Sequence, residues 1–266
     1  MNRYENKVAI ITGGGGSIGS ATARRLASEG GAIVLFDLHA ENAERVAAEI
    51  NKSGGKALAI TGDILVRADI ERALAATLKE FGQLDILVNN AATCTKATIA
   101  EIDEADWDKD VDGTLKGAFL VSRAVLPGMV ANKKGVIVNV GSVNGLMYFG
   151  NPAYSAGKAG LLNLTQSIAT EYGKRGIRCA MVSPGTIRTG TASWTRRLER
   201  DPQVFEKLSR WYPVGRVGLP DDIAAAVAYL ASDDAAFVSG SNLVVDGGLT
   251  AGMGLMADTL LAERDA

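Results

Sequence analysis

Three polar residues in the middle of the sequence have types and a spacing suited to proton transfer. Tyr154 and Lys158 stand four residues apart in a segment of helical period, so they lie on one helix face, a turn apart. A lysine cation beside a phenol stabilises the phenolate and lowers the phenol's pKa, which favours Tyr154 as a general acid/base. Ser142 follows the predicted strand Gly135–Val140 and is placed to hydrogen-bond a substrate oxygen where charge develops. A Tyr and Lys pair alone also occurs on ordinary helix surfaces, so the surrounding elements decide its meaning.

A glycine-rich turn near the N-terminus is suited to binding a dinucleotide. Thr12 to Gly19 includes four consecutive glycines between a predicted strand and a helix that starts near Ser17. Small residues let the backbone approach a pyrophosphate, and the helix N-terminus offers unpaired N–H groups and a favourable dipole. Asp37, 18 residues after Gly19, ends the second strand. Its carboxylate would bind both ribose hydroxyls and repel a 2′-phosphate, which favours NAD over NADP; an acidic cap of the helix from Ala40 is the alternative.

The elements that must position these residues follow a βαβ pattern. Short β-branched runs alternate with longer segments of helical period, which predicts a doubly wound, Rossmann-like α/β fold with a parallel seven-stranded sheet and helices on both faces. The expected strands are Lys7–Thr12, Ala32–Asp37, Lys56–Thr61, Ile86–Asn89, Gly135–Val140, Ile177–Ser183 and Leu243–Val245. Besides the helix from Ser17, the clearest expected helices are Ala40–Ser53, Ala68–Phe81, Ala105–Ala131, Ala153–Tyr172 and Asp221–Ala231.

The organisation of the chain predicts one nucleotide-binding domain over residues 1–266. No internal repeat or linker divides it. Residues 190–218 interrupt the alternation of elements and carry Trp194 and Trp211, which indicates a lid over a pocket. Residues 249–266 form a C-terminal tail without an assigned role.

Composition excludes several classes of function. The formal net charge of −2 gives no electrostatic footprint for nucleic acid or anionic lipid. The longest apolar run has about eight residues where a membrane span needs ~20, and the first 16 residues lack the features of a signal peptide; we expect a cytoplasmic protein. A single histidine, His39, and two distant cysteines, Cys94 and Cys179, predict no metal site and no disulfide scaffold.

From about Asn6 to Gly248 the chain resembles the short-chain dehydrogenase/reductase family. Seven motifs occur in the family's order, so chance agreement is remote. They are the glycine turn at Thr12 to Gly19, Asp63 after the third strand, Asn89-Asn90-Ala91 after the fourth, Ser142, Tyr154 with Lys158, Pro184-Gly185 after the sixth, and Asp246-Gly247-Gly248.

The resemblance implies a role for each matching residue. Tyr154 would transfer the hydroxyl proton, Lys158 would tune it and bind the nicotinamide ribose, and Ser142 would hold the reacting oxygen. Asp63 and Ile64 would frame the adenine, Asn90 would lie along the adenosine ribose, Ile187 with Thr189 would anchor the carboxamide and pyrophosphate, and Asn89 would tie neighbouring strands. The full expected cofactor set is Gly13, Ser17, Ile18, Gly19, Asp37, Leu38, Asp63, Ile64, Asn90, Tyr154, Lys158, Pro184, Gly185, Ile187 and Thr189.

The chain departs from the family's pattern at four places. Thr114 stands where the family's fourth catalytic residue, an asparagine, is expected, which implies a rearranged or weakened proton relay. Ser17 replaces the middle glycine of the turn, and Ala92 replaces a glycine after Asn89-Asn90-Ala91. Ser142 and Tyr154 are 12 residues apart, one fewer than expected, which predicts a shorter loop over the substrate.

The sequence therefore predicts an oxidoreductase that transfers a hydride between NAD(H) and a secondary alcohol or ketone. The alternative is an NAD-binding sensor or scaffold with reduced or lost activity, supported by Thr114. A sugar-nucleotide epimerase is expected to fit poorly, because such proteins need a larger C-terminal region. Candidate substrate contacts are Asn144, Tyr148, Trp194 and Trp211. The resemblance also implies a homotetramer or homodimer.

Overall fold

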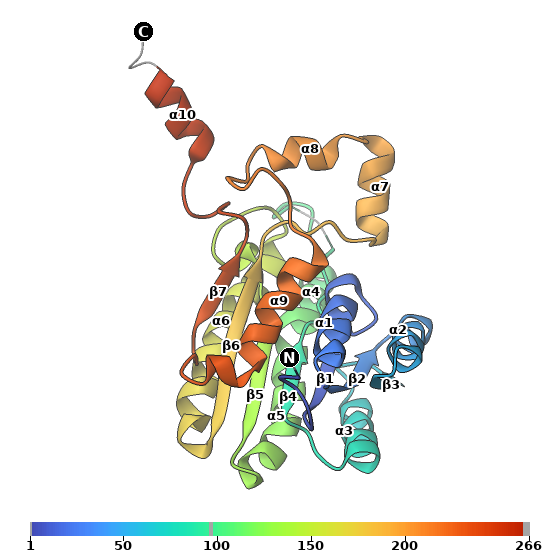
Figure 1. Cartoon of the computed structure of the whole chain (residues 1–266). Coiled ribbons are helices and arrows are strands. Elements are labelled where there is room, and N and C mark those ends of the chain that lie inside the picture. Colours follow the sequence, from blue (N-terminus) through green and yellow to red (C-terminus); the bar gives the residue numbers. More distant parts are fainter. Residues whose placement is uncertain (1, 96–97, 263–266) are drawn as a thin grey trace.

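Seven parallel strands form one sheet in the order β3-β2-β1-β4-β5-β6-β7 in the computed structural model, which describes residues 2–95 and 98–262 (Figure 1). Every expected strand is confirmed to within one residue, and the doubly wound, Rossmann-like fold is confirmed with them. The strands are β1 (Val8–Thr12), β2 (Ala32–Asp37), β3 (Lys56–Thr61), β4 (Ile86–Asn89), β5 (Gly135–Val140), β6 (Ile177–Pro184) and β7 (Asn242–Val245).

The strand order reverses between β1 and β4, and this reversal opens a crevice at the carboxyl ends of the strands. The chain runs outward from β1 to β2 and β3, then returns to pair β4 with the other side of β1. Helices that follow β1 and β4 therefore leave toward opposite faces of the sheet, and ligands of such folds bind where they diverge. The glycine turn follows β1 and Asn90 follows β4, so both lie at this point.

Alternate residues of each strand supply two separate apolar cores. Ile11 and Leu35 belong to the core that α1, α2 and α9 cover, whereas Ile10, Val34 and Leu87 belong to the core under α3, α5 and α6. The main helices are α1 (Ser17–Ser28), α2 (Ala40–Lys52), α3 (Arg67–Phe81), α5 (Gly117–Ala131), α6 (Pro152–Tyr172) and α9 (Pro220–Ala231).

The expectation of one continuous helix over Ala105–Ala131 was wrong. The segment divides into α4 (Glu104–Val111), a π-helical turn η1 (Asp112–Lys116) and α5. Glycines let neighbouring segments approach this turn closely, since a Cβ on Gly113 would lie 2.1 Å from Oγ1 of Thr93. A π turn inserts an extra residue per turn and often occurs at functional sites.

The same segment is the one described helix run, Glu104–Ala131, whose length and mean hydropathy reach those of a membrane span. The expectation that no segment of the chain approaches the length and hydropathy of a membrane span was therefore wrong for this segment. Buried residues of α5, among them Val121 and Val125, form part of the core beneath the sheet, so the hydropathy reflects internal packing.

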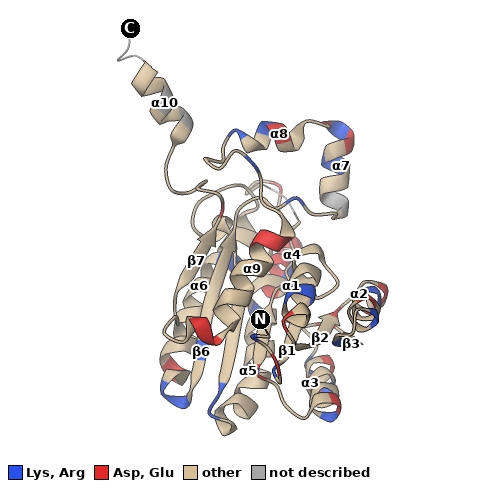
Figure 2. Cartoon of the chain, viewed as in Figure 1, with Lys and Arg blue, Asp and Glu red and all other residues tan. Residues whose placement is uncertain are grey.

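Residues 190–218 fold into a separate layer over the carboxyl ends of the strands (Figure 1). They contain α7 (Ala192–Arg200) and α8 (Val204–Ser209), followed by the chain to α9. Phe205, Tyr212 and Val217 form a small buried cluster of their own, which Trp194 joins with its ring 4.8 Å from that of Phe205. The C-terminal tail contains α10 (Gly254–Ala262), which points away from the sheet. Figure 2 shows that charges of both signs are scattered over most of the other helices.

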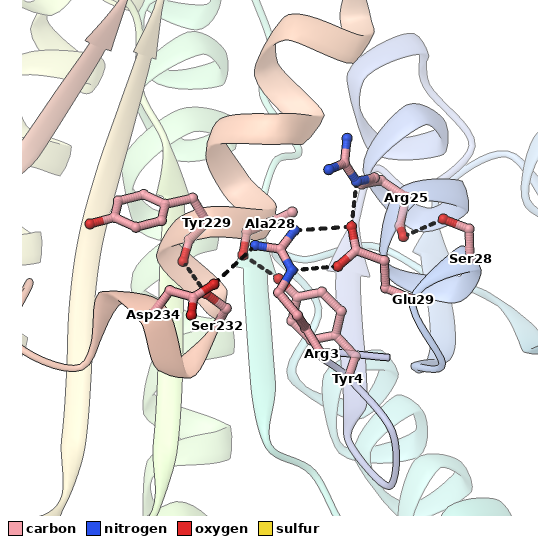
Figure 3. A network of polar contacts seen from close by, with 9 residues as sticks. All are labelled: Arg3, Tyr4, Arg25, Ser28, Glu29, Ala228, Tyr229, Ser232 and Asp234. Carbon is pink, nitrogen blue, oxygen red and sulfur yellow. Dashed lines mark hydrogen bonds and ion pairs between the residues drawn. The ribbon is translucent and has the colours of Figure 1, made fainter. Parts of the chain in front are cut away.

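A network of charged residues joins the N-terminal segment to α1 and to the residues after α9 (Figure 3). Arg3 forms two hydrogen bonds to the carboxylate of Glu29, at 2.5 and 3.0 Å, and Arg25 adds a third at 2.5 Å. Tyr4 beside it donates to a carbonyl of α9. The hydrogen bond from Arg3 lowers the pKa of Glu29 to about 2, although burial opposes the shift and Arg25 assists it.

We predict that Glu29→Gln lowers the free energy of unfolding at pH 7 by about 1–3 kcal/mol, because it removes a partly buried, charge-assisted hydrogen bond. The folded pKa is depressed, so this stability is present above about pH 4.5 and is lost as the pH falls toward 2. Urea denaturation between pH 3 and 7 measures it. The matched control is Glu49→Gln, since Glu49 also accepts bonds from two arginines but is 44% exposed; an equal loss in both variants would contradict the account.

Candidate active site

The glycine turn has a backbone that only small residues permit. Gly13 has φ +62°, in the left-handed region, and a Cβ on Gly19 would lie 2.2 Å from the carbonyl oxygen of Gly13. No side chain caps the N-terminus of α1 and its first turn holds no acidic residue. Ser17, Ile18 and Gly19 thus present an N-terminus of positive partial charge to the crevice, which fits a pyrophosphate.

Asp37 at the end of β2 is fixed against the glycine turn. Its side chain is 8% exposed; Oδ2 accepts a hydrogen bond from the N–H of Gly15 at 2.9 Å and Oδ1 accepts one from His39 at 2.9 Å. Asp37 therefore does not cap helix α2, which was the alternative role. The N-terminus of α2 has no side-chain cap, and the N–H that Asp37 accepts from belongs to His39, the residue before the helix. A carboxylate oxygen has two lone pairs, so each keeps a free acceptor site for a ribose hydroxyl. Leu38 beside it is 59% exposed.

The residues after β3 and β4 border the same crevice. Oδ1 of Asp63 accepts a hydrogen bond from the N–H of Leu65 at 2.8 Å, which fixes a turn before α3. Ile64 packs against the start of α5, directly after the π turn, since a Cβ on Gly117 would lie 2.3 Å from its Cδ1. Asn90 donates from Nδ2 to the carbonyl oxygens of Thr12 and Gly13, both at 3.0 Å. Asn90 therefore stabilises the glycine turn. This contact was not part of its expected role, which was to lie along the adenosine ribose.

Two buried asparagines tie the central strands together. Asn89 of β4 donates from Nδ2 to Oδ1 of Asn139 at 2.8 Å and to Oγ of Ser122 at 2.9 Å. Asn139 of β5 donates onward to Thr165 of α6 at 2.8 Å. The expected strand-tying role of Asn89 is confirmed. Sequence reasoning missed Asn139. A polar residue inside the otherwise apolar run of β5 was the signal that could have indicated its buried hydrogen bonds.

Ser142, Tyr154 and Lys158 come together at the end of β5. Ser142 lies two residues beyond the strand, and its Oγ accepts a hydrogen bond from the N–H of Asn144 at 3.1 Å. Tyr154 is half-buried in the first turn of α6. Lys158 is 2% exposed; its ammonium donates to the carbonyl oxygen of Val140 at 2.5 Å and lies 5.5 Å from the centre of the Tyr154 ring. The predicted one-turn pairing on α6 is thus observed.

The structure does not bear out the expected lowering of the phenol's pKa by Lys158. Burial raises the pKa of Tyr154 to about 12, although a hydrogen bond with Ser142 lowers it, and the nearby Cys94 and Asp110 add to the rise. Burial also lowers the pKa of Lys158 to about 8. The cost of removing the phenolate from water outweighs the stabilisation of the phenolate by the ammonium of Lys158. The ammonium bonds to Val140 and lies against the ring of Tyr154 rather than its hydroxyl.

Thr114 occupies the π turn beside α6. Its side chain is 1% exposed, and its hydroxyl donates to the carbonyl oxygen of Thr93 at 3.2 Å. Gly157, between Tyr154 and Lys158 in sequence, faces it: a Cβ at this position would lie 3.1 Å from Cβ and Cγ2 of Thr114. Thr114 therefore packs against the Tyr154–Lys158 turn and bonds to the segment after β4.

The residues after β6 form the other wall of the crevice. Gly185 donates to the carbonyl oxygen of Val245, which joins Pro184-Gly185 to β7. Ile187 is buried and pairs with Gly218 at the end of the lid segment. The Oγ1 of Thr189 lies 3.3 Å from that of Thr191, just before α7.

Of the four candidate substrate contacts, only Trp211 lines the cavity of about 790 Å³ that is bordered by residues 210–213, the loop after Ser142 and the C-terminal tail. Trp194 packs inside the lid on Phe205, and Asn144 bonds to Gly150 and Ser155 within its own loop. Tyr148 is 68% exposed. Sequence reasoning missed other apolar residues that line this cavity, among them Phe149, Met253 and Met256.

Comparison with known proteins agrees with this geometry. A family model described as enoyl-(acyl carrier protein) reductase matches residues 14–250. The chain is 42% identical over 254 residues to 2-(S)-hydroxypropyl-CoM dehydrogenase 3 of Xanthobacter autotrophicus, covering 94% of this chain and 99% of that one.

Two solved structures are similar over nearly their whole length. An oxidoreductase of the short chain dehydrogenase/reductase family from Burkholderia thailandensis has a TM-score of 0.87 at 38% identity, covering 96% of this chain and 97% of that one. An NAD+-bound xylitol dehydrogenase has a TM-score of 0.87 at 31% identity, covering 92% and 99%. With the order of motifs and strands, these matches establish that the chain is an oxidoreductase of the short-chain dehydrogenase/reductase family.

Proposed function

We propose that the protein transfers a hydride between NAD(H) and a secondary alcohol or ketone, with Tyr154 as the general acid/base. The observation that carries the proposal is the convergence of Ser142, Tyr154 and the buried Lys158 at the carboxyl edge of the sheet, where the glycine turn and Asp37 also lie. The dehydrogenases among its relatives, including the xylitol and 2-(S)-hydroxypropyl-CoM enzymes, support an alcohol or carbonyl substrate.

Each residue of this set has a physical task. NAD supplies the acceptor for the hydride that leaves the carbinol carbon. Ser142 holds the substrate oxygen, while the phenolate of Tyr154 takes the hydroxyl proton as the carbonyl forms, and the reverse reaction returns it. Because burial raises the pKa of Tyr154, alcohol oxidation needs the minor, deprotonated form and its rate rises with pH. The buried ammonium of Lys158 is placed to stabilise that form once the cofactor is bound.

We predict that Tyr154→Phe lowers kcat/KM for alcohol oxidation by about 10²- to 10⁴-fold, because it removes the group that accepts the proton. NAD binding, measured by calorimetry, should be nearly unchanged. The control is Tyr229→Phe, which alters an exposed phenol on α9 outside the site and should keep full activity. Turnover in Tyr154→Phe equal to that of the unaltered protein would remove Tyr154 from its role.

We predict a clear preference for NAD over NADP that depends on the charge of Asp37. Asp37→Asn keeps an acceptor toward the glycine turn but removes the charge that repels a 2′-phosphate. The ratio of kcat/KM with NADP to that with NAD should rise about tenfold or more, equivalent to about 1.4 kcal/mol. Glu41→Gln, in the first turn of α2, is the control and should leave the ratio unchanged. An unchanged ratio in Asp37→Asn would contradict this assignment.

A second candidate function is an NAD-binding sensor or scaffold with little turnover. Its support is Thr114, whose hydroxyl is engaged with Thr93, together with the raised pKa of Tyr154. It predicts cofactor binding by calorimetry without turnover on a broad panel of alcohols and ketones. Turnover that Tyr154→Phe abolishes would decide against it.

We also propose that the protein is a homodimer or homotetramer. Leu243 and Val244 on the edge strand β7 and Phe237 before it are exposed apolar side chains, and an uncovered edge strand invites pairing. Light scattering at micromolar concentration should therefore give a mass of two or four times 27.7 kDa. A mass of one chain would contradict this proposal.

A further inference from the structure

Asp110, near the C-terminal end of α4, is a buried carboxylate to which the proposed function gives no task. Its side chain is 1% exposed. Oδ2 accepts two hydrogen bonds from Thr95, from the N–H at 2.9 Å and from the hydroxyl at 3.0 Å. Oδ1 is equally buried and has no hydrogen-bond partner among the described residues. Because a buried acceptor without a partner costs about 1–3 kcal/mol, such a group calls for an explanation in function.

The fold holds this carboxylate beside the helical turn that carries Tyr154. Val111, the next residue along α4, approaches α6 so closely that a Cβ on Gly157 would lie 3.7 Å from its Cα. Thr114 touches the same glycine from the π turn. Asp110 is itself buried, so its charge is screened less than that of a carboxylate on the surface.

Besides the hydroxyl of Ser142, the titratable groups around Tyr154 in the described part of the chain come from three elements. Lys158 belongs to its own helix, Cys94 to the segment after β4, and Asp110 to α4. Burial is the main cause of the raised pKa of Tyr154, and the charge of Asp110 adds to it because a nearby anion disfavours the phenolate. Lys158 is the group of opposite sign, and its ammonium donates a hydrogen bond to the carbonyl oxygen of Val140.

We propose that Asp110 is a positioning residue that acts on Tyr154 through its charge, from its buried place on α4 where that helix packs against the first turns of α6. Tyr154 can then donate a proton to a carbonyl over a wider pH range, and it takes a proton from an alcohol only at higher pH. Thr95 fixes the carboxylate through Oδ2, and Oδ1 has no hydrogen-bond donor in the part of the chain that the structure describes. The inference rests on the proposed role of Tyr154 as general acid/base.

The test is Asp110→Asn, which keeps the shape and an oxygen acceptor for both Thr95 bonds but removes the charge. In the NAD-bound enzyme, the pH at which kcat/KM for alcohol oxidation is half-maximal should fall by on the order of one unit. Asp112→Asn is the matched control, because Asp112 lies two residues away, pairs with Lys116 at 2.7 Å and is on the surface. An unchanged profile in Asp110→Asn would overturn the proposal.

A second variant separates charge from the fixing of the loop. Thr95→Val removes the hydroxyl bond to Asp110 but keeps the N–H bond and the charge. Its profile should stay near that of the unaltered enzyme. A shift as large as that of Asp110→Asn would show that Asp110 acts only by holding the loop, and the proposal would fail.

A spectroscopic readout distinguishes failure of this inference from failure of the proposed function. Tyrosinate absorbance of the NAD-bound protein is titrated with and without the additional change Tyr154→Phe, and the difference isolates the ionisation of Tyr154. If no alcohol is oxidised, the proposed function fails, yet this titration still decides the effect of Asp110. A lower pKa of Tyr154 in Asp110→Asn supports the inference, and an unchanged one contradicts it.

Discussion

A hydrogen bond from the buried ammonium of Lys158 to the carbonyl oxygen of Val140 ties helix α6 to the end of strand β5. A cation that is 2% exposed must keep an acceptor, so this bond fixes the rotation of the first turns of α6. Ser142, two residues beyond Val140, and Tyr154, one turn before Lys158, are thereby held on the same side of the crevice. The chemistry of the site depends on this constraint.

Buried polar contacts extend the same constraint across the sheet. Asn89 and Asn139 connect β4, β5 and α6, while Asn90 braces the glycine turn from β4. Each of these hydrogen bonds contributes more to the stability of the fold in the apolar interior than it would at the surface, because losing it would leave a buried amide unpaired. The cofactor side and the proton-transfer side of the crevice are therefore parts of one hydrogen-bonded framework.

The sequence was sufficient for the fold and for the residue pairing, because both depend on local periodicity. Strand bounds agreed to within one residue, and a spacing of four did place Lys158 against the ring of Tyr154. Properties that depend on packing could not be predicted. The π turn lies where Gly113 and, directly after it, Gly117 make close contacts with distant residues, and the raised pKa of Tyr154 comes from burial between elements far apart in the chain. Trp194 packs on Phe205 within residues 190–218, and the position of Trp194 in the sequence does not indicate this contact.

A crystal structure of the protein with NAD and a ketone or unreactive alcohol analogue tests the central claim most directly. The account predicts that the hydroxyls of Tyr154 and Ser142 both lie within about 3.2 Å of the same ligand oxygen, with Lys158 against the nicotinamide ribose. A nicotinamide ring bound elsewhere, or a Tyr154 hydroxyl turned away from the ligand, would contradict it.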